Sequence, residues 1–410
     1  MNRKPDVVLI VVYLLLVLSG WLSIFSTSNQ SGEFLVQSNY GYQLIWIASS
    51  VLIALFAYVL KTRFFWNIAQ YIYILFCVLL LVVIFVGTEV SGAKSWIGIG
   101  NFGIQPAEFA KYATCLFLAK YVSSAHCDLT KSNSLLRVSL LIMIPIVLIL
   151  LQNDTGSALP FLFLIFALFR EGLTPWLLII GFTAILLFVL LVYFSQWTVL
   201  LIVAILFALM FLKMYKKKKY HLGMLTVFFI IAVYIFSVDM LYNKVLKTHQ
   251  KERIELLFGK IEDPRGVGYN VNQAQIAIGS GGFWGKGFGN GTQTQLKYVP
   301  EQHTDFIFCT IGEEHGFLGT AYVVVLYMLL ISRIIILSEN NQDGYVRIYG
   351  YCIACIFFAH FAINIGMTIG LMPVIGIPLP FMSYGGSSLW AFTLMLFTFI
   401  NIESKSHGWG

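Results

Sequence analysis

The chain has 410 residues, of which 59% are hydrophobic and only 11% are charged. Soluble domains carry about 25% charged residues, so this composition excludes an ordinary soluble protein and predicts an all-α polytopic integral membrane protein in contact with membrane lipid. The net charge of +7 does not indicate a nucleic-acid partner, and we expect none, because membrane proteins concentrate lysine and arginine on their cytoplasmic side.

The first apolar run, residues 7–26, is predicted to be a transmembrane helix. It is too long for the apolar part of a signal peptide, and no small-residue cleavage site follows it. Similar runs recur along the chain and predict about twelve transmembrane helices in all. The other spans are expected at 41–61, 67–87, 106–123, 136–152, 156–170, 176–194, 197–214, 222–242, 306–332, 347–371 and 385–402.

The charges between the spans indicate which side each loop faces. With a cytoplasmic N-terminus, the lysine run 216–219, Arg333 and Lys405 all fall on the cytoplasmic side. The short outside loops hold almost no basic residue except Lys94. We therefore expect a multi-pass protein with both termini in the cytoplasm. Residues 243–305 then form a long extracytoplasmic loop, and a loop of this length is usually functional.

The fourth predicted span contains two opposite charges, Glu108 and Lys111. A charged side chain inside a membrane costs about 2.5–3.5 kcal/mol on insertion scales, so each one needs a reason. The spacing of three places both on one helix face, where they can neutralise each other. Two interpretations stay open: a structural ion pair, or a polar cavity in which Lys111 meets an anionic group of a substrate.

Asp154 lies in the tight turn NDTGSA, residues 153–158, just before a predicted helix. An aspartate at this position can accept hydrogen bonds from the free N–H groups of the first turn. We favour this capping role, and a direct catalytic role is the alternative.

The glycine-rich stretch at residues 279–293 superficially resembles a phosphate-binding loop. It lacks the required spacing, because Ser280 stands where the first glycine belongs and Gly287 follows Lys286 in place of serine or threonine. We expect a flexible loop that wraps a bulky substrate or re-enters the edge of the bilayer.

The stretch PEQHTDFIF, residues 300–308, places Asp305 where the long polar loop runs into an apolar helix. Asp305 could occupy the helix N-terminus, where a carboxylate is favoured by the dipole and by capping. A zinc site is a second possibility, although three or four ligands at a regular spacing are missing. A lone aspartate can also act as a general base if a substrate hydroxyl comes within reach.

A proline- and glycine-rich loop, residues 370–388, precedes the last span. Its serines, Ser387 among them, are donors suited to phosphate or sugar oxygens. A packed, rigid hairpin is the alternative, since three prolines stiffen the segment.

Six motifs follow one another along the chain: GAKSWIGIG, QPAEFAK, QNDTG, YNVNQAQIAIGSGGFWGKG, PEQHTDFIFCTIGEE and PVIGIPLPFMSYGGSS. Together and in this order they resemble the shape, elongation, division and sporulation family of bacterial membrane glycosyltransferases. They cover nearly the whole chain, and the last two look more like the elongation (RodA) branch than the division (FtsW) branch. The family usually has ten spans, so the resemblance implies one membrane domain, 1–410, with an inserted transmembrane hairpin at 197–242.

The resemblance implies an enzyme of the bacterial cytoplasmic (inner) membrane. Its activity would be polymerisation of lipid II into glycan strands on the outer face, for cell elongation and cell shape. Its partner would be a class B penicillin-binding protein. The essential aspartate of the family maps onto Asp305, and Trp96, Glu108 and Lys111 match other motif positions. Ser95, Ala107 and Asn153 depart from the usual arginine, serine and proline, so no role is carried over to them.

The expected reaction uses Asp305 as general base on the 4-hydroxyl of the acceptor sugar, with undecaprenyl pyrophosphate as leaving group. Gln302 and His303 would orient the loop or the acceptor. The growing negative charge needs compensation by Lys111, Lys94 or Arg265. No tightly bound cofactor or protein-held metal is expected, and a divalent cation (Mg²⁺ or Mn²⁺) is a candidate for the same task. A lipid II flippase and a non-catalytic scaffold for the transpeptidase are the alternatives.

Overall fold

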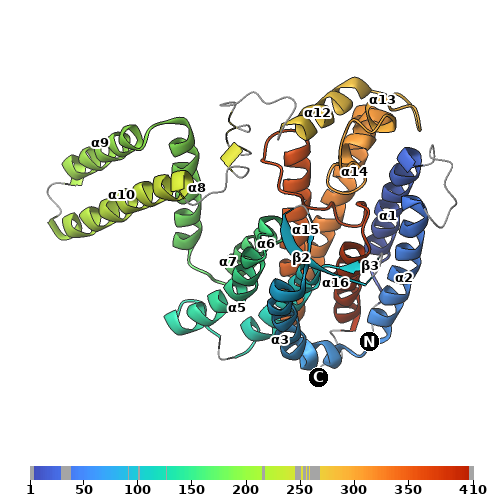
Figure 1. Ribbon diagram of the computed structural model, residues 1–410. Helices are drawn as coiled ribbons and strands as arrows, with labels where there is room; N and C mark the ends of the chain where they lie inside the picture. Colours follow the sequence, from blue (N-terminus) through green and yellow to red (C-terminus); the bar gives the residue numbers. More distant parts are fainter. Residues whose placement is uncertain are drawn as a thin grey trace. The chain divides into compact units, whose positions relative to one another are not determined.

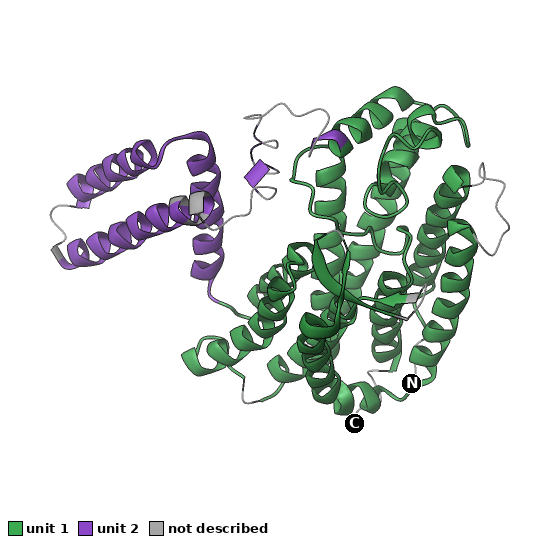
Figure 2. Cartoon of the chain, in the orientation of Figure 1, with its two compact units in different colours: residues 1–173, 270–410 green, residues 174–269 purple. Residues whose placement is uncertain are grey.

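The computed structural model is predominantly helical, as the composition predicted (Figure 1). The chain divides into two compact units, residues 1–173 with 270–410 and residues 174–269 (Figure 2). The structure describes residues 4–28, 38–90, 92–99, 102–125, 127–214, 218–244, 251–252, 255, 258 and 268–405.

Each of the twelve predicted spans coincides with a helix or a pair of helices. Within the described residues, nine helices are long and apolar enough to cross a membrane. The first unit contains α1 (Val7–Ser28), α2 (Asn39–Val59), α3 (Thr62–Val86), α4 (Pro106–Val122), α5 (Ser132–Leu151), α6 (Thr155–Leu162), α7 (Leu164–Arg170), α14 (Ile307–Glu339), α15 (Gly344–Thr368) and α16 (Gly386–Lys405).

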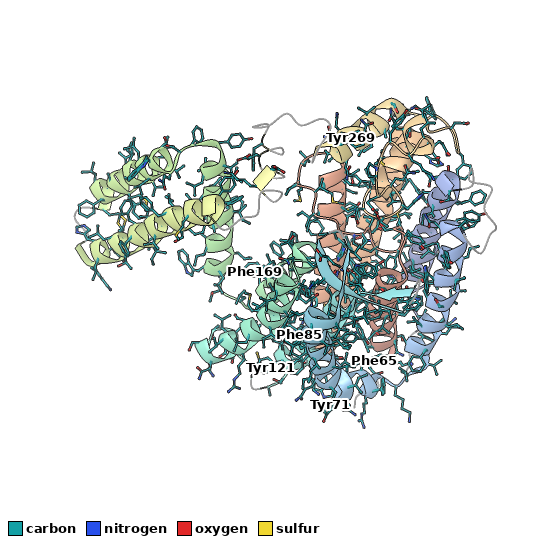
Figure 3. The ribbon with its side chains drawn as sticks, viewed as in Figure 1. Phe65, Tyr71, Phe85, Tyr121, Phe169 and Tyr269 are labelled. Carbon is teal, nitrogen blue, oxygen red and sulfur yellow. The ribbon has the colours of Figure 1, made fainter. Side chains whose placement is uncertain are left out.

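Helix α4 and helix α16 are the most enclosed of the shorter elements, because they carry polar side chains that lipid would not accept. Helix α4 packs against α3 and α15, and α16 packs against α2. The outer helices instead have two distinct faces. On α3, Phe65 is buried, whereas Tyr71 and Phe85 are 72% and 79% exposed (Figure 3). This one-sided burial is typical of a helix between a protein core and lipid.

The predicted span 156–170 is broken into α6 and α7 at Phe163. Pro160 cannot donate a backbone hydrogen bond, and the N–H of Phe163 turns back to the carbonyl of Pro160 at 3.2 Å. Hydropathy alone did not reveal this break, because the residues on both sides are equally apolar.

A small antiparallel sheet was not predicted. Strands β1 (Thr88–Val90), β2 (Ala93–Ile99) and β3 (Phe102–Ile104) pair in sequential order within the expected loop between α3 and α4. In the register, Glu89 faces Lys94 and Ile97 faces Ile104. The turn after β1 contains Gly92 at a φ of 84°, which glycine adopts without steric cost.

The predicted extracytoplasmic loop contains regular structure. Helix α12 (Tyr269–Gly281) and the single turn α13 (Thr292–Gln295) lie within it, and its last residues form the turn that leads into α14. Helix α14 is interrupted at Gly316, whose φ of 61° and ψ of −153° are not helical.

The second unit consists mainly of α8 (Pro175–Tyr193), α9 (Gln196–Met214), the short η2 (Lys218–Tyr220) and α10 (His221–Lys244). Helices α9 and α10 pack against each other, and both contact α8. Val199, Val203 and Ile235 make a buried cluster with Leu187 of α8. The compact unit therefore begins at residue 174 and includes α8, which the sequence analysis had not grouped with the hairpin.

Both termini of the first unit lie at the same end of the helical bundle (Figure 1). Arg333 near the end of α14 forms an ion pair with Asp6 at 2.6 Å. Lys405 and Asn401 of α16 donate to the carbonyl oxygens at the end of α2, including that of Tyr58. The start of α14, with Asp305 just before it, lies at the opposite end of that helix.

Candidate functional site

Asp305 immediately precedes the start of α14. The N-cap position of this helix is Phe306, so Asp305 stands one residue before the cap. Its side chain is half-buried, and its backbone carbonyl accepts a hydrogen bond from Nδ2 of Asn364 at 2.8 Å. The same amide nitrogen donates to the carbonyl of Ile377 at 2.7 Å. Asn364 therefore joins the backbone of Asp305 to the loop before α16.

A glycine without room for a side chain lies against the Asp305 carboxylate. A Cβ atom at Gly376 would stand 3.2 Å from Oδ2 of Asp305, and the φ of Gly376 is 76°. On the other side of the same segment, a Cβ at Gly156 of α6 would stand 2.9 Å from the carbonyl oxygen of Ile375. The backbone of Ile375 and Gly376 therefore lies close to the N-terminal turn of α6, and Gly376 also lies close to the Asp305 carboxylate.

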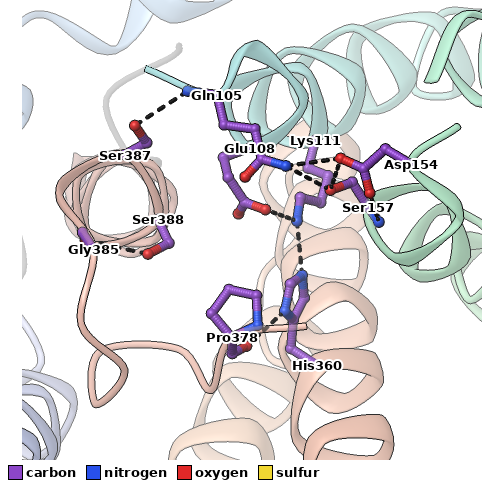
Figure 4. Close-up of polar contacts among 10 residues, drawn as sticks. All are labelled: Gln105, Glu108, Lys111, Asp154, Ser157, His360, Pro378, Gly385, Ser387 and Ser388. Carbon is purple, nitrogen blue, oxygen red and sulfur yellow. Dashed lines mark hydrogen bonds and ion pairs between the residues drawn. The ribbon is translucent and has the colours of Figure 1, made fainter. Parts of the chain in front are cut away.

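Asp154 caps α6, as one of its two predicted roles required. Its Oδ1 accepts from the backbone N–H of Ser157 at 3.0 Å, and its Oδ2 accepts from the Ser157 hydroxyl at 2.9 Å. Oδ2 also accepts from Nε2 of Gln105 at 2.8 Å (Figure 4). Asn153 has a φ of 61°, a conformation that asparagine tolerates and that proline cannot adopt.

Glu108 and Lys111 form an ion pair with Nζ and Oε1 2.7 Å apart, and both side chains are buried. Nζ of Lys111 also lies 2.8 Å from Nε2 of His360 on α15 (Figure 4). Nδ1 of His360 is 3.0 Å from the carbonyl oxygen of Pro378. The structural interpretation of this pair fits the geometry, because Lys111 has no surface through which to contact a substrate in this conformation.

The loop before α16 is bonded directly to the motif that contains Asp305. The N–H of Tyr384 donates to the carbonyl of His303 at 2.8 Å, and the hydroxyl of Ser383 donates to the carbonyl of Thr304 at 2.6 Å. Ser387, predicted to bind substrate, is buried. Its Oγ accepts from the N–H of Gln105 at 3.2 Å and donates to the carbonyl of Gly103 at 3.1 Å.

His303 and Gln302 lie in the turn before Asp305. Nδ1 of His303 is 3.0 Å from the hydroxyl oxygen of Thr27 in α1. Burial lowers the pKa of His303, and nearby Lys297 lowers it further, against a smaller opposite effect of Glu301. The two larger effects therefore favour the neutral form of the His303 imidazole. The side chain of Gln302 is buried. Burial favours a role in orienting the loop over direct contact with a molecule that arrives from solvent.

Two of the remaining predicted site residues, Lys94 and Trp96, lie on strand β2 of the small sheet. Lys94 is exposed on β2, and its N–H donates to the carbonyl of Gln152, two residues before Asp154, at 3.0 Å. Trp96 on the same strand lies over Gly103, where a Cβ atom would be 2.8 Å from the indole ring. Arg265 lies outside the described residues.

The glycine-rich stretch is held by two buried carboxylates rather than left as a flexible loop. Glu313 accepts from Nζ of Lys286 at 2.7 Å, and from the N–H groups of Gln293 and Thr294 at 2.9 Å each. Glu314 accepts from the N–H of Gly289 at 3.3 Å and from the hydroxyl of Ser26. Lys286 therefore neutralises a protein carboxylate, which explains its position in a sequence that fails the phosphate-loop pattern.

Sequence reasoning missed His360, Asn364 and Glu313 as contributors to this region. His360 and Asn364 are polar residues four positions apart in an apolar span, and this spacing places them on one helix face. That signal was present in the sequence. The partners of His360 and Asn364 could not be predicted from the sequence. Both side chains bind backbone carbonyl groups, which every residue carries.

No group of three or more His, Cys, Asp or Glu side chains that could hold a metal ion occurs in the part of the chain that the structure describes. Two other carboxylates of the predicted motifs are already engaged, since Asp154 caps α6 and Glu108 pairs with Lys111. These residues do not offer a ligand set for a protein-held Mg²⁺ or Mn²⁺.

Solved structures with the same fold include two bacterial proteins. One is a chain from the study "Structural coordination of polymerization and crosslinking by a peptidoglycan synthase complex", with a TM-score of 0.72, 24% identity and 98% of each chain covered. The other is the rod shape determining protein RodA of Thermus thermophilus, with a TM-score of 0.65, 23% identity, and 98% of this chain and 97% of that chain covered.

Curated relatives match along almost the whole chain. The peptidoglycan glycosyltransferase RodA of Treponema pallidum (strain Nichols) is 30% identical over 98% of both chains. The peptidoglycan glycosyltransferase MrdB of Escherichia coli (strain K12) is 31% identical over 94% of this chain and 89% of its own. The model of the FtsW, RodA and SpoVE family, described as "Cell cycle protein", matches residues 6–219 and 171–407. The chain therefore belongs to the FtsW, RodA and SpoVE family of cell cycle proteins.

Proposed function

We propose that this protein is a peptidoglycan glycosyltransferase that polymerises lipid II into glycan strands during cell elongation and cell-shape maintenance. The relatives that match over nearly the full chain are named peptidoglycan glycosyltransferases. The observation that supports a site at Asp305 is its setting: a half-buried carboxylate whose backbone is fixed by Asn364 and whose Oδ2 faces Gly376. A catalytic base needs such fixed placement, so that it meets a substrate hydroxyl in one geometry.

In the proposed reaction, the 4-hydroxyl of the acceptor sugar attacks the anomeric carbon of the donor. A new C–O bond forms as the bond from that carbon to the pyrophosphate oxygen breaks, so the anomeric configuration inverts. Asp305 takes the proton of the attacking hydroxyl, and undecaprenyl pyrophosphate leaves with the bonding electrons. Pyrophosphate needs no added proton to leave, which makes one carboxylate sufficient.

The leaving pyrophosphate gains negative charge, and a cation must stabilise it. Lys94 is the better candidate among the described residues, because it is exposed and its backbone is bonded to the turn that contains Asp154. Lys111 is buried and engaged by Glu108 and His360, so it has no free approach to substrate in this conformation.

We place the protein in the bacterial cytoplasmic membrane with both termini inside and Asp305 outside, where lipid-linked sugars are polymerised. The ion pairs of Arg333 with Asp6 and of Arg347 with Glu171 lie at the helix ends assigned to the cytoplasm. A class B penicillin-binding protein is the proposed partner, since one structural neighbour is described as part of a peptidoglycan synthase complex.

The test uses purified protein with its transpeptidase partner, labelled lipid II, and a β-lactam that blocks cross-linking. Wild type should form glycan strands, and Asp305→Asn should form none while still binding the partner. Glu301→Gln is the matched control, because Glu301 is an exposed carboxylate of the same turn that bonds Thr304. Equal polymer from wild type and Asp305→Asn would exclude Asp305 as the base.

The rival functions have their own outcomes in the same experiment. A flippase would make no polymer and would move lipid II across proteoliposome membranes. A scaffold would make no polymer either, and the Asp305→Asn variant would still support its partner. A flippase should have polar groups along the whole path, whereas Asp154 and Gln105 meet at the N-terminal end of α6 and Asp305 lies just before the N-terminal end of α14.

A further inference from the structure

We propose that His360 is a positioning residue, through which the buried Glu108–Lys111 pair fixes the backbone of Gly376–Pro378 against the Asp305 carboxylate. This inference rests on the proposed glycosyltransferase activity. It gives Lys111 a role that requires no contact with substrate.

The hydrogen-bond pattern determines the state of the His360 ring. The Lys111 ammonium has donors only, so Nε2 of His360, 2.8 Å away, must be the acceptor. The ring proton then lies on Nδ1, which is 3.0 Å from the carbonyl oxygen of Pro378 and donates to it. A second proton on Nε2 would point at the lysine cation, so Lys111 keeps the imidazole neutral and in one tautomer.

The lysine is itself fixed on every side that the structure describes. Nζ donates to Oε1 of Glu108 at 2.7 Å and lies 5.5 Å from the centre of the Phe392 ring. Lys111, Glu108 and His360 are all fully or almost fully buried. A buried charge destabilises the fold unless it is paired and hydrogen-bonded. The Glu108–Lys111 pair is connected through His360 to the carbonyl of Pro378.

The segment so held is the one that borders Asp305. His360 and Asn364 are one helical turn apart on α15 and bind the consecutive carbonyls of Pro378 and Ile377. Asn364 binds the carbonyl of Asp305 as well, and Gly376 faces Oδ2 of Asp305. Two points on one helix face therefore set the distance between this segment and the catalytic carboxylate.

Two substitutions separate the two bonds of His360. In His360→Asn the shorter side chain can place an amide nitrogen near the position of Nδ1, which keeps a donor for Pro378. In His360→Gln the longer side chain can place an amide oxygen near the position of Nε2, which keeps an acceptor for Lys111 and loses the donor to Pro378. Thr393→Val is the matched control, because it removes one buried hydrogen bond, between Thr393 on α16 and Tyr13 on α1.

The measurements are kcat and KM for lipid II polymerisation, together with the unfolding temperature of each variant. We expect His360→Gln to lose about 100-fold in kcat with little change in KM, as a misplaced reacting group does. His360→Asn should lose less. The double variant Glu108→Gln with Lys111→Met should lower kcat without raising KM, and adding His360→Gln to it should cause little further loss.

Three results would overturn the inference. The first is an equal kcat for His360→Asn and His360→Gln. The second is a rise in KM for His360→Gln in place of a fall in kcat. The third is a loss of kcat that is proportional to the fall in unfolding temperature, with Thr393→Val on the same line. Failure of the proposed function looks different, because Asp305→Asn would then polymerise lipid II like wild type. Inactive Asp305→Asn with fully active His360→Gln would sink the positioning role alone.

Discussion

Asn364 on α15 donates from one amide nitrogen to the backbone carbonyls of Asp305, at 2.8 Å, and Ile377, at 2.7 Å. These two acceptors are 72 residues apart in the chain. The amide therefore connects the turn before α14 with the loop before α16, and both segments meet at the Asp305 carboxylate. Four predictions follow from this arrangement and its surroundings.

Replacing Asn364 by leucine should weaken both stability and activity. Two carbonyls would lose their donor, and an unpaired buried polar group costs about 1–3 kcal/mol. Thermal unfolding in detergent measures the first effect and lipid II polymerisation the second. Thr368→Val on the same helix is the control, because Thr368 bonds only its own helix at the carbonyl of Asn364. Unchanged polymerisation by Asn364→Leu would contradict the role of this bond.

Gly376→Ala should reduce polymerisation by about 10- to 100-fold while the protein still folds. The new Cβ would lie 3.2 Å from Oδ2 of Asp305, at a φ of 76° that alanine rarely adopts. Gly279→Ala in α12 is the control, since a Cβ there meets nothing within 4 Å. The two variants should separate clearly in a turnover assay, and equal rates would show that Gly376 does not constrain the carboxylate.

Glu313→Gln should loosen the glycine-rich stretch. Removal of one partner from a buried ion pair costs about 3–5 kcal/mol, and the partial exposure of Lys286 places this case at the lower end. Limited proteolysis of residues 285–295 reports the loosening directly. Combining Glu313→Gln with Lys286→Met should recover part of the lost stability, because the unpaired lysine is then removed. Identical cleavage of wild type and Glu313→Gln would show that Glu313 does not hold the glycine-rich stretch in place.

Acid should destabilise the turn that contains His303. Its folded-state pKa is lowered, chiefly by burial, so the unfolded chain binds a proton more readily than the folded one. This contribution to the free energy of unfolding is complete above the unfolded value of about 6.5 and is lost as the pH falls through the lower, folded-state pKa. Unfolding measured between pH 8 and pH 5 should show a smaller acid loss in His303→Gln. The same slope in both proteins would show that another group is responsible.

Hydropathy located the apolar spans within the described part of the chain, because lipid leaves a polypeptide few alternatives. Each predicted span coincides with an observed helix or helix pair, because unpaired backbone groups cannot face hydrocarbon. The exceptions in detail are α14, which extends beyond the predicted end at 332, and the predicted span 156–170, which is divided into α6 and α7. Asp305 was singled out from sequence by its position where a polar segment enters an apolar helix and by the motif around it, and its catalytic role stays a prediction. Asp154 was recognised as a cap because capping acts over three residues, a distance that sequence displays directly.

Tertiary structure decided the features that depend on distant partners. Lys111 meets His360 across 249 positions, and Glu313 meets Lys286 across 27. The short sheet between α3 and α4 depends on register, which composition leaves open. The sequence determined which polar side chains enter the membrane region, because hydrophobicity is a property of each residue. Which carbonyl or carboxylate each side chain meets is a property of packing between helices, and only the folded chain specifies it.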